Sequence, residues 1–201
     1  MLEVRAKKKL GEFLLDSDLS DEGFICMRGP NGSGKSTFLN IVAGILSPDS
    51  GFVKLFGRDV TNLAQEKREI VLVTPDSYIP HLTVEKHLRW GARVKNLEID
   101  PAAVSNVRSA LGISYEGKLA QLSLGMRERV ALGTALLSSP RLILIDETFS
   151  NIDNREQFIS EFRKLSSEAK IHVIFTTQFE DDSKVSDHSY LMNAGKLAKL
   201  S

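Results

Sequence analysis

The sequence has little that would mark a secreted or membrane-spanning protein. Its one cysteine, Cys26, excludes an internal disulfide and lies in the apolar run Phe24–Met27, where a buried thiol is expected. The amino terminus lacks the apolar segment of a signal peptide, and no run approaches the roughly 18 to 20 apolar residues of a membrane span. These absences predict a soluble, cytoplasmic protein.

An excess of charge of either sign is also absent. The 26 basic residues offset the 26 acidic ones, so no overall charge attracts the chain to nucleic acid, and no nucleic-acid partner is expected. Low-complexity tracts, internal repeats and linkers rich in Gly, Pro or Ser are missing too. With 201 residues, of which 42% are hydrophobic, the chain is expected to form one α/β domain over residues 1–201.

Short, continuous apolar runs predict strands that are buried on both faces, as in a mainly parallel sheet flanked by helices. The four expected strands are Phe24–Arg28, Ile70–Thr74, Leu142–Ile145 and Ile171–Thr176. The tail from Tyr190 to Ala198 is typical of two short strands around a turn, which we expect to form an antiparallel edge of the sheet. Ligands would bind at the carboxyl ends of the parallel strands.

Residues 82–137 differ from the rest of the chain because apolar residues recur there every three or four positions. This spacing predicts helices, and the segment could form a small helical subdomain inserted in the sheet domain. The alternative is a set of ordinary crossover helices between strands.

The strongest motif is Gly29–Ser36, which satisfies the pattern G-x-x-x-x-G-K-[ST] between an expected strand and an expected helix. Its glycines allow the backbone N–H groups to point at a phosphate, and the following helix adds its partial positive charge. Lys35 would bridge the β- and γ-phosphates, Ser36 would bind Mg²⁺ and Thr37 would contact the α-phosphate. The predicted nucleotide-binding residues here are Gly29, Pro30, Asn31, Gly32, Ser33, Gly34, Lys35, Ser36 and Thr37.

A second site is predicted where the apolar strand Leu142–Ile145 delivers two adjacent carboxylates, Asp146 and Glu147. Side chains alternate along a strand, so the two acids would have different roles. Asp146 would hold Mg²⁺ beside Ser36, and Glu147 would polarise the water that attacks the γ-phosphate. Without a phosphate loop in the same chain, a solvated strand end or a helix cap would explain the pair equally well.

The segment Leu122–Met126, about twenty residues before the acidic pair, resembles the signature motif of the ABC ATPase family, L-S-G-G-Q, with Leu124 and Met126 in place of a glycine and the glutamine. Ser123 offers a hydroxyl and Gly125 allows close approach of the backbone, directly before an expected helix. The resemblance extends over the whole chain, including 37–51 and the D-loop-like Ser150–Asp153. It implies a P-loop NTPase fold.

The resemblance also implies the oligomer and the partners. In that family two nucleotide-binding subunits pair head to tail, and each ATP lies between the phosphate loop of one subunit and the signature of the other. Ser123 and Gly125 would then act on a nucleotide held by a second subunit, in a homodimer or heterodimer. A nucleotide-binding domain without a translocation path would need a separate transmembrane permease, and the segment from Tyr78 to Trp90 would contact it.

Two positions that the resemblance places at the γ-phosphate also depart from the family pattern. Gln178 stands where the resemblance places a switch histidine, and because an amide cannot titrate or carry charge, hydrolysis could be slow. The segment Thr74–Ser77 lacks the expected Q-loop glutamine, and Asp76 is the predicted stand-in as a Mg²⁺ ligand. Phe13 is the one aromatic residue before Phe24 that could stack on adenine, but it is expected to be a core residue.

The leading hypothesis is therefore an ATPase subunit of an ABC transporter, held at the inner face of the cell membrane by its permease. Two alternatives stay open: a soluble ABC-type clamp, and a regulatory ATP binder with slow turnover. The chain ends soon after the last expected strands, which slightly favours export over import.

Overall fold

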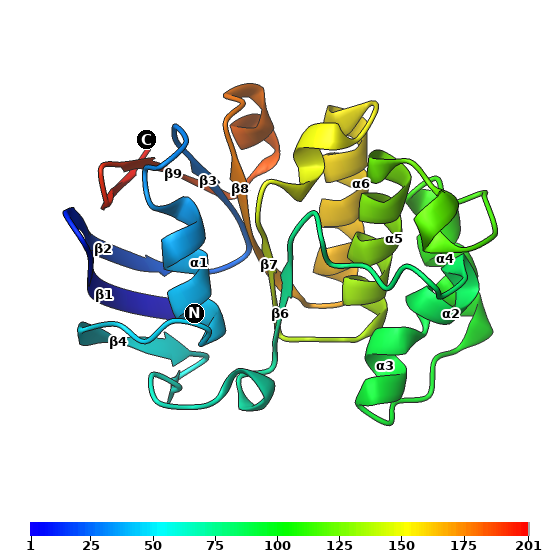
Figure 1. The fold of residues 1–201 in the computed structure, drawn as a ribbon, viewed down its shortest axis with the longest axis horizontal. Coiled ribbons are helices and arrows are strands. Elements are labelled where there is room, and N and C mark those ends of the chain that lie inside the picture. Colours follow the sequence, from blue (N-terminus) through cyan, green and yellow to red (C-terminus); the bar gives the residue numbers. More distant parts are fainter. Residues whose placement is uncertain (201) are drawn as a thin grey trace.

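The computed structural model describes residues 1–200, which form two sheets with helices between and beside them (Figure 1). The larger sheet has the strand order β10-β9-β3-β8-β7-β6. Its strands are β3 (Phe24–Arg28), β6 (Ile70–Val73), β7 (Leu142–Ile145), β8 (His172–Thr177), β9 (His188–Asn193) and β10 (Lys196–Lys199). All pairings are parallel except that of β10 with β9, so the mainly parallel sheet and its antiparallel edge are confirmed.

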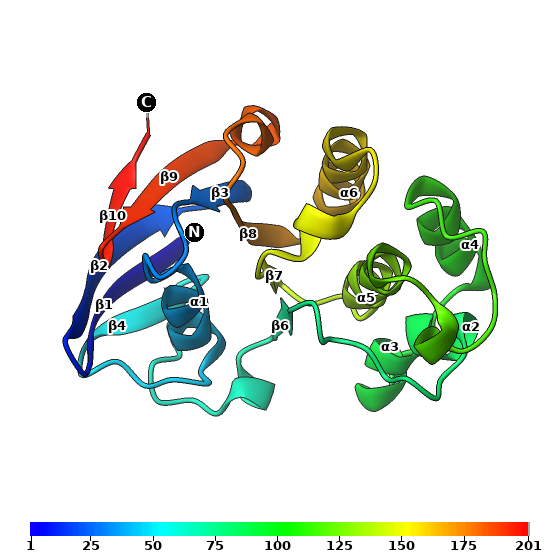
Figure 2. The ribbon, with the colours of Figure 1, turned by 45° about the horizontal axis from the view of Figure 1, so that its top comes forward.

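A second sheet, which the sequence did not predict, packs on the other side of helix α1 (Lys35–Ala43). It is antiparallel, with the order β2-β1-β4-β5, and comprises β1 (Leu2–Leu10), β2 (Phe13–Asp21), β4 (Ser50–Leu55) and β5 (Arg58–Asp59). Helix α1 lies between this sheet and the larger one (Figure 2). Its position places the residues that follow β3 beside the β1–β2 hairpin.

Two apolar clusters fill the two faces of the larger sheet, and they divide the residues of each strand by alternation. On β7, Ile143 and Ile145 belong to the cluster that includes helices α5 (Leu124–Leu137) and α6 (Arg155–Glu168). Leu142 and Leu144 belong to the cluster around α1 and the antiparallel sheet. Strands buried on both faces explain why the apolar runs are continuous rather than alternating.

Helices α2 (Val84–Leu88), α3 (Trp90–Val94), α4 (Pro101–Ala110) and α5 occupy the segment 82–137. They gather on the side of the larger sheet opposite α1 (Figures 1 and 2). Their apolar residues join α6 and the sheet in one continuous cluster, so a separate helical subdomain stays a prediction. Within residues 1–200, each helix is too short or too polar to span a membrane.

Arg68 joins distant parts of the α1 layer. Its buried guanidinium donates to the carbonyl oxygens of Ile41 and Val42, both at 3.0 Å, in the last turn of α1. It also donates to the carbonyls of Leu63 at 2.9 Å and Thr61 at 2.8 Å. Helix ends leave carbonyls without intrahelical partners. The Ile41 carbonyl also accepts from the Gly44 N–H at 3.1 Å, whereas Arg68 satisfies the Val42 carbonyl, which would otherwise be unpaired.

We expect the substitution Arg68→Met to lower the free energy of unfolding by about 3 kcal/mol, because it leaves several buried carbonyls without donors. Urea denaturation measures the change. Arg5→Met is the matched control, since Arg5 is exposed and pairs with Asp18 at the surface, 3.4 Å away; it should change the value by about 0.5 kcal/mol or less. Equal effects of the two substitutions would contradict the role assigned to Arg68.

Candidate nucleotide-binding site

A cavity of about 550 Å³ opens at the carboxyl ends of β3 and β7, the edge at which ligands bind in parallel sheets. Its lining joins the phosphate loop, the acidic pair and the β1–β2 hairpin. The lining residues are Leu10, Phe13, Asn31, Gly32, Ser33, Gly34, Lys35, Ser36, Thr37, Pro75, Asp146 and Glu147. The two motifs that the sequence placed more than a hundred residues apart therefore border the same cavity.

The phosphate loop connects β3 to α1 through a left-handed turn. Gly34 precedes the helix with a φ of 112°, and a Cβ there would lie 2.8 Å from the ring of Phe13. Glycine is therefore required both by backbone conformation and by space. Among the described residues no side chain caps α1 and its first turn carries no acid, so its N–H groups are available to an anion.

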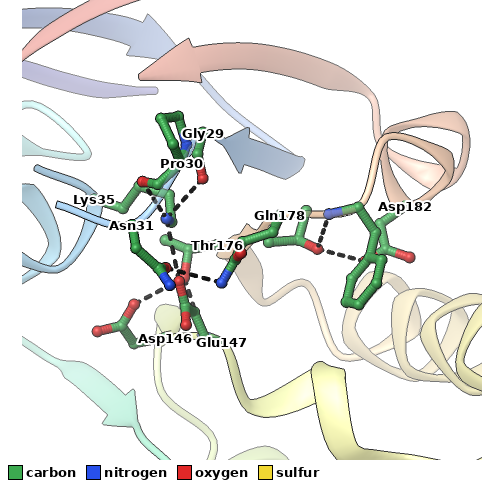
Figure 3. A network of polar contacts seen from close by, with 11 residues as sticks. Gly29, Pro30, Asn31, Lys35, Asp146, Glu147, Thr176, Gln178 and Asp182 are labelled. Atoms are coloured by element: carbon green, nitrogen blue, oxygen red, sulfur yellow. Dashed lines mark hydrogen bonds and ion pairs between the residues drawn. The ribbon is translucent and has the colours of Figure 1, made fainter. Parts of the chain in front are cut away.

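Lys35 is the most buried cation of the site, with 4% of its side chain exposed. Its ammonium donates to the carbonyl oxygens of Gly29 at 2.8 Å and Pro30 at 3.1 Å. It also forms an ion pair with Glu147, 3.1 Å from Oε1 (Figure 3). One buried charge thus joins the phosphate loop to the acidic pair.

The acidic pair follows β7 and is fixed from both neighbouring strands. Asp146 donates its backbone N–H to the Val73 carbonyl of β6, at 2.8 Å. On the other side, the Thr176 hydroxyl of β8 donates to Asp146 Oδ1 at 2.8 Å and accepts from the Glu147 N–H at 2.9 Å (Figure 3). Glu147 itself has a φ of 55°, a left-handed conformation that is uncommon for residues other than glycine.

Gln178, at the end of β8, reaches the phosphate loop. Its side-chain amide donates to Asn31 Oδ1 at 2.8 Å (Figure 3). The hydroxyl of the preceding residue, Thr177, donates to Asp182 Oδ2 at 2.6 Å and accepts from the Phe179 N–H at 3.0 Å. The residue predicted to replace a switch histidine therefore lies at the rim of the phosphate loop.

The signature-like segment lies elsewhere. Ser123 caps α5, its hydroxyl accepting from the Met126 N–H at 3.3 Å. Gly125 packs so closely that a Cβ would lie 2.5 Å from the carbonyl oxygen of Asn151. Neither Ser123 nor Gly125 lines the phosphate-loop cavity, and α5 and α1 lie on opposite sides of β6 and β7 (Figure 1).

A family model described as ABC transporter matches residues 15–150, which include the phosphate loop, the signature-like segment and the acidic pair. The chain belongs to the ABC transporter family. This confirms the predicted family and the predicted function as an ATP-binding and ATP-hydrolysing subunit.

Curated relatives cover almost all of this ABC subunit. A molybdate/tungstate import ATP-binding protein of Archaeoglobus fulgidus is 37% identical, covering 99% of this chain and 88% of the relative. A sulfate/thiosulfate import ATP-binding protein of Synechococcus elongatus is 35% identical, covering 98% and 60%. A spermidine/putrescine import ATP-binding protein of Haemophilus influenzae is 32% identical, covering 99% and 57%. The chain thus spans little more than half the length of the last two.

Solved structures share the fold. An ATP-binding cassette of an ABC transporter in its ADP conformation is 25% identical, with a TM-score of 0.79 over 98% of this chain and 89% of that one. A dimeric cassette in a post-hydrolysis state with ADP and phosphate is 22% identical, with a TM-score of 0.83 over 100% and 99%. The predicted P-loop NTPase fold is therefore confirmed.

The geometry does not bring Asp76 of this ABC subunit to the phosphate loop. Asp76 is exposed and borders a different cavity, whereas Pro75 lines the phosphate-loop cavity. A tight turn is the cause: the Ser77 N–H donates to the Thr74 carbonyl at 2.9 Å, and the Tyr78 N–H donates to the Asp76 carbonyl at 2.8 Å. Asp76 therefore lines a different cavity from Ser36 and Asp146, and its role as a Mg²⁺ ligand stays a prediction.

Two hydrophobic residues of the cavity were not assigned to it from the sequence. Phe13 was expected in the core, yet it borders the cavity while it also packs against the apolar cluster around α1. Leu10, across the same hairpin, was not considered. The alternation of buried residues along β2, such as Leu15 and Leu19, could have placed Phe13 on the same face of a strand.

Glu128 was also missed. It lies in α5 with 1% of its surface exposed, and its Oε1 accepts from the Asn151 side-chain amide at 2.9 Å. Its Oε2 has no partner among residues 1–200. Burial raises the pKa of this carboxyl to about 7, against the opposing effect of the Asn151 hydrogen bond.

A raised pKa makes stability depend on pH. Since the folded state holds the Glu128 proton up to about pH 7 while the unfolded state releases it near 4.5, the contribution of Glu128 to stability is greatest below pH 4.5 and falls as the pH rises toward 7. Because glutamine does not titrate, we expect Glu128→Gln to abolish this decrease in the free energy of unfolding, which amounts to about 2 to 3 kcal/mol. Urea denaturation at pH 5 and pH 8 should show the variant's advantage growing with pH. Glu98→Gln, at an exposed position, should show no such trend.

Proposed function

We propose that this chain hydrolyses Mg²⁺-bound ATP between its own phosphate loop and the signature-like segment of a second nucleotide-binding subunit. The hydrolysis would drive a separate membrane permease, which would hold the chain at the cytoplasmic face of the membrane. The observation that carries the proposal is the convergence of the phosphate loop, Asp146 and Glu147 on one cavity.

Nucleotide binding would rest on groups that face this cavity. The loop amides and the start of α1 offer N–H groups to the phosphates, and Lys35 would exchange part of its present contacts for the β- and γ-phosphates. Phe13 is aromatic, half-buried and at the border of the cavity, so its ring offers a face for the base.

The residues present suit Mg²⁺. Ser36 supplies a hydroxyl and Asp146 a carboxylate, both lining the cavity, and hard oxygen ligands of this kind are what Mg²⁺ takes beside substrate phosphates. Bound there, the ion would offset the negative charge of the phosphates. Asp76 is left out of this set because it lines another cavity.

Glu147 would orient the attacking water and accept its proton, once Lys35 turns to the phosphates and releases the carboxylate. Gln178, in contact with Asn31, would hydrogen-bond a γ-phosphate oxygen without carrying charge. This neutral amide is one feature that motivates the alternative of a slow-turnover regulatory binder. The steady-state rate of ATP hydrolysis separates the two, because a regulatory binder would show binding with negligible turnover.

The dimer completes the site. Ser123 and Gly125 lie away from the cavity of their own subunit, while Ser123 and the start of α5 present a hydroxyl and N–H groups suited to an anion. A head-to-tail arrangement would bring these groups to the partner's nucleotide, so ATP binding would favour the closed dimer.

The permease would bind at a second cavity, of about 480 Å³, between β6 and helices α3 and α5. Trp90 and Val94 border it with 41% and 63% of their surfaces exposed. Tyr78 also borders it, half-buried, with its hydroxyl accepting from Arg127 at 2.8 Å. Exposed apolar side chains around a hollow suit an apolar element of a partner protein.

We infer import as the direction of transport. The three relatives described above are all named as import ATP-binding proteins, which favours import over the export that the sequence analysis slightly preferred. The named cargoes range from molybdate and sulfate to spermidine, so the proposal extends to the direction and leaves the cargo to the permease.

The first test is Glu147→Gln. We expect it to lower the rate of ATP hydrolysis about 100-fold or more, because the amide cannot accept the proton of the attacking water. ATP binding should persist, and light scattering should show a dimer stabilised by Mg²⁺ and ATP. Glu156→Gln makes the same change at an exposed position of α6 and should leave the rate unchanged. Normal turnover of the Glu147 variant would refute the proposed role.

The second test is Trp90→Ala. We expect it to weaken co-purification with the co-expressed permease by about tenfold or more, because it removes an exposed aromatic anchor. ATP hydrolysis by the isolated subunit should stay unchanged. The control Leu14→Ala removes another exposed apolar side chain, 52% exposed on β2, and should leave co-purification intact. Equal losses from both variants would argue against this surface.

A further inference from the structure

Thr176 is a buried hydroxyl that contacts both members of the acidic pair. It lies on β8 with 1% of its surface exposed. In the parallel pairing of β7 and β8, Ile145 faces Phe175, so Thr176 is level with Asp146 one strand away. Its hydroxyl donates to Asp146 Oδ1 at 2.8 Å and accepts from the Glu147 N–H at 2.9 Å.

These two bonds fix two different properties of the acidic pair. The bond to Oδ1 sets the rotation of the Asp146 carboxylate. The bond from the Glu147 N–H holds the peptide that enters the left-handed conformation of Glu147, whose φ is 55°. Such a conformation persists only where the surroundings fix it. Thr148 secures the other end, its hydroxyl donating to the Asp146 carbonyl at 3.1 Å.

A buried strand threonine commonly satisfies its hydroxyl with a nearby backbone carbonyl, which would make it part of the core only. Here the donor and the acceptor sides of the hydroxyl are both used on the acidic pair, as Figure 3 shows. The neighbouring Thr177 bonds instead to Asp182 and Phe179. The two contacts of Thr176 are therefore specific to its side of the strand.

We infer that Thr176 is a positioning residue for ATP hydrolysis, aligning the Asp146 carboxylate with Mg²⁺ and the Glu147 carboxylate with the attacking water. The inference rests on the roles proposed above for the two acids. Thr176 does not line the cavity, so it acts through them and does not touch the nucleotide.

The test compares Thr176→Val, which keeps the shape and removes the hydroxyl, with Thr176→Ser, which keeps the hydroxyl. We expect Val to lower kcat about 10- to 100-fold with little change in the KM for ATP, and Ser to restore kcat to within a few-fold of the wild type. Calorimetric titration with a non-hydrolysable ATP analogue supplies a second measurement. Addition of Mg²⁺ should increase the affinity for the analogue less in Thr176→Val than in the wild type. The affinity measured without Mg²⁺ should be the same in both proteins.

Ser166→Ala is the matched control for stability, since it removes another buried hydroxyl, which donates only to the Arg163 carbonyl at 2.9 Å; kcat should not change. Thr176→Ser as slow as Thr176→Val would overturn the inference, because the hydroxyl would then not be what positions the acids. The inference would also be overturned if Thr176→Val kept the wild-type kcat and the wild-type increase in affinity on addition of Mg²⁺, in an assay where Glu147→Gln is inactive. If Glu147→Gln is fully active, the proposed function fails instead.

Discussion

The ammonium of Lys35 is the contact on which the arrangement of the site depends. A buried charge must be paired and hydrogen-bonded, and Lys35 finds its acceptors in two carbonyls of the phosphate loop and in Glu147. Those acceptors come from the end of β3 and the end of β7. Burial of this charge therefore requires the ends of β3 and β7 to lie close together. The parallel sheet meets this requirement, because β8 alone separates the two strands.

The division of the larger sheet into two faces fits the proposed arrangement, in which two subunits share each nucleotide site. One cluster holds α1 and the antiparallel sheet, which border the cavity for the nucleotide. The other holds α5, whose start carries Ser123. The phosphate loop and α1 thus lie on one face of the sheet, whereas the groups proposed to bind the partner's nucleotide lie on the opposite face. Within one subunit the two sets of groups are therefore apart.

Prediction from the sequence succeeded where a function depends on residues adjacent in the chain. Residue patterns in the sequence predicted the phosphate loop and the acidic pair, and the structure brings both to one cavity. The strands that precede them, β3 and β7, have the predicted bounds. Features that depend on folding at a distance were missed. In the sequence Arg68 resembles any surface arginine, because its carbonyl partners come from distant segments. The cavity that Asp76 lines likewise depends on a turn that its position in the sequence does not reveal. The antiparallel sheet was missed although Leu2, Val4 and Ala6 alternate with polar residues.

The close approach of Gly125 to Asn151 has a mechanical consequence. A carbonyl that would lie 2.5 Å from an added Cβ leaves the start of α5 no room to move closer to the segment that follows Glu147. The bond between Asn151 and Glu128 ties the same two parts a turn further along the helix. Under the proposed function, a displacement of the residues that follow Glu147 would therefore press directly on the start of α5, where Ser123 lies. Each subunit would in this way report the state of its own nucleotide at the place where it holds its neighbour's.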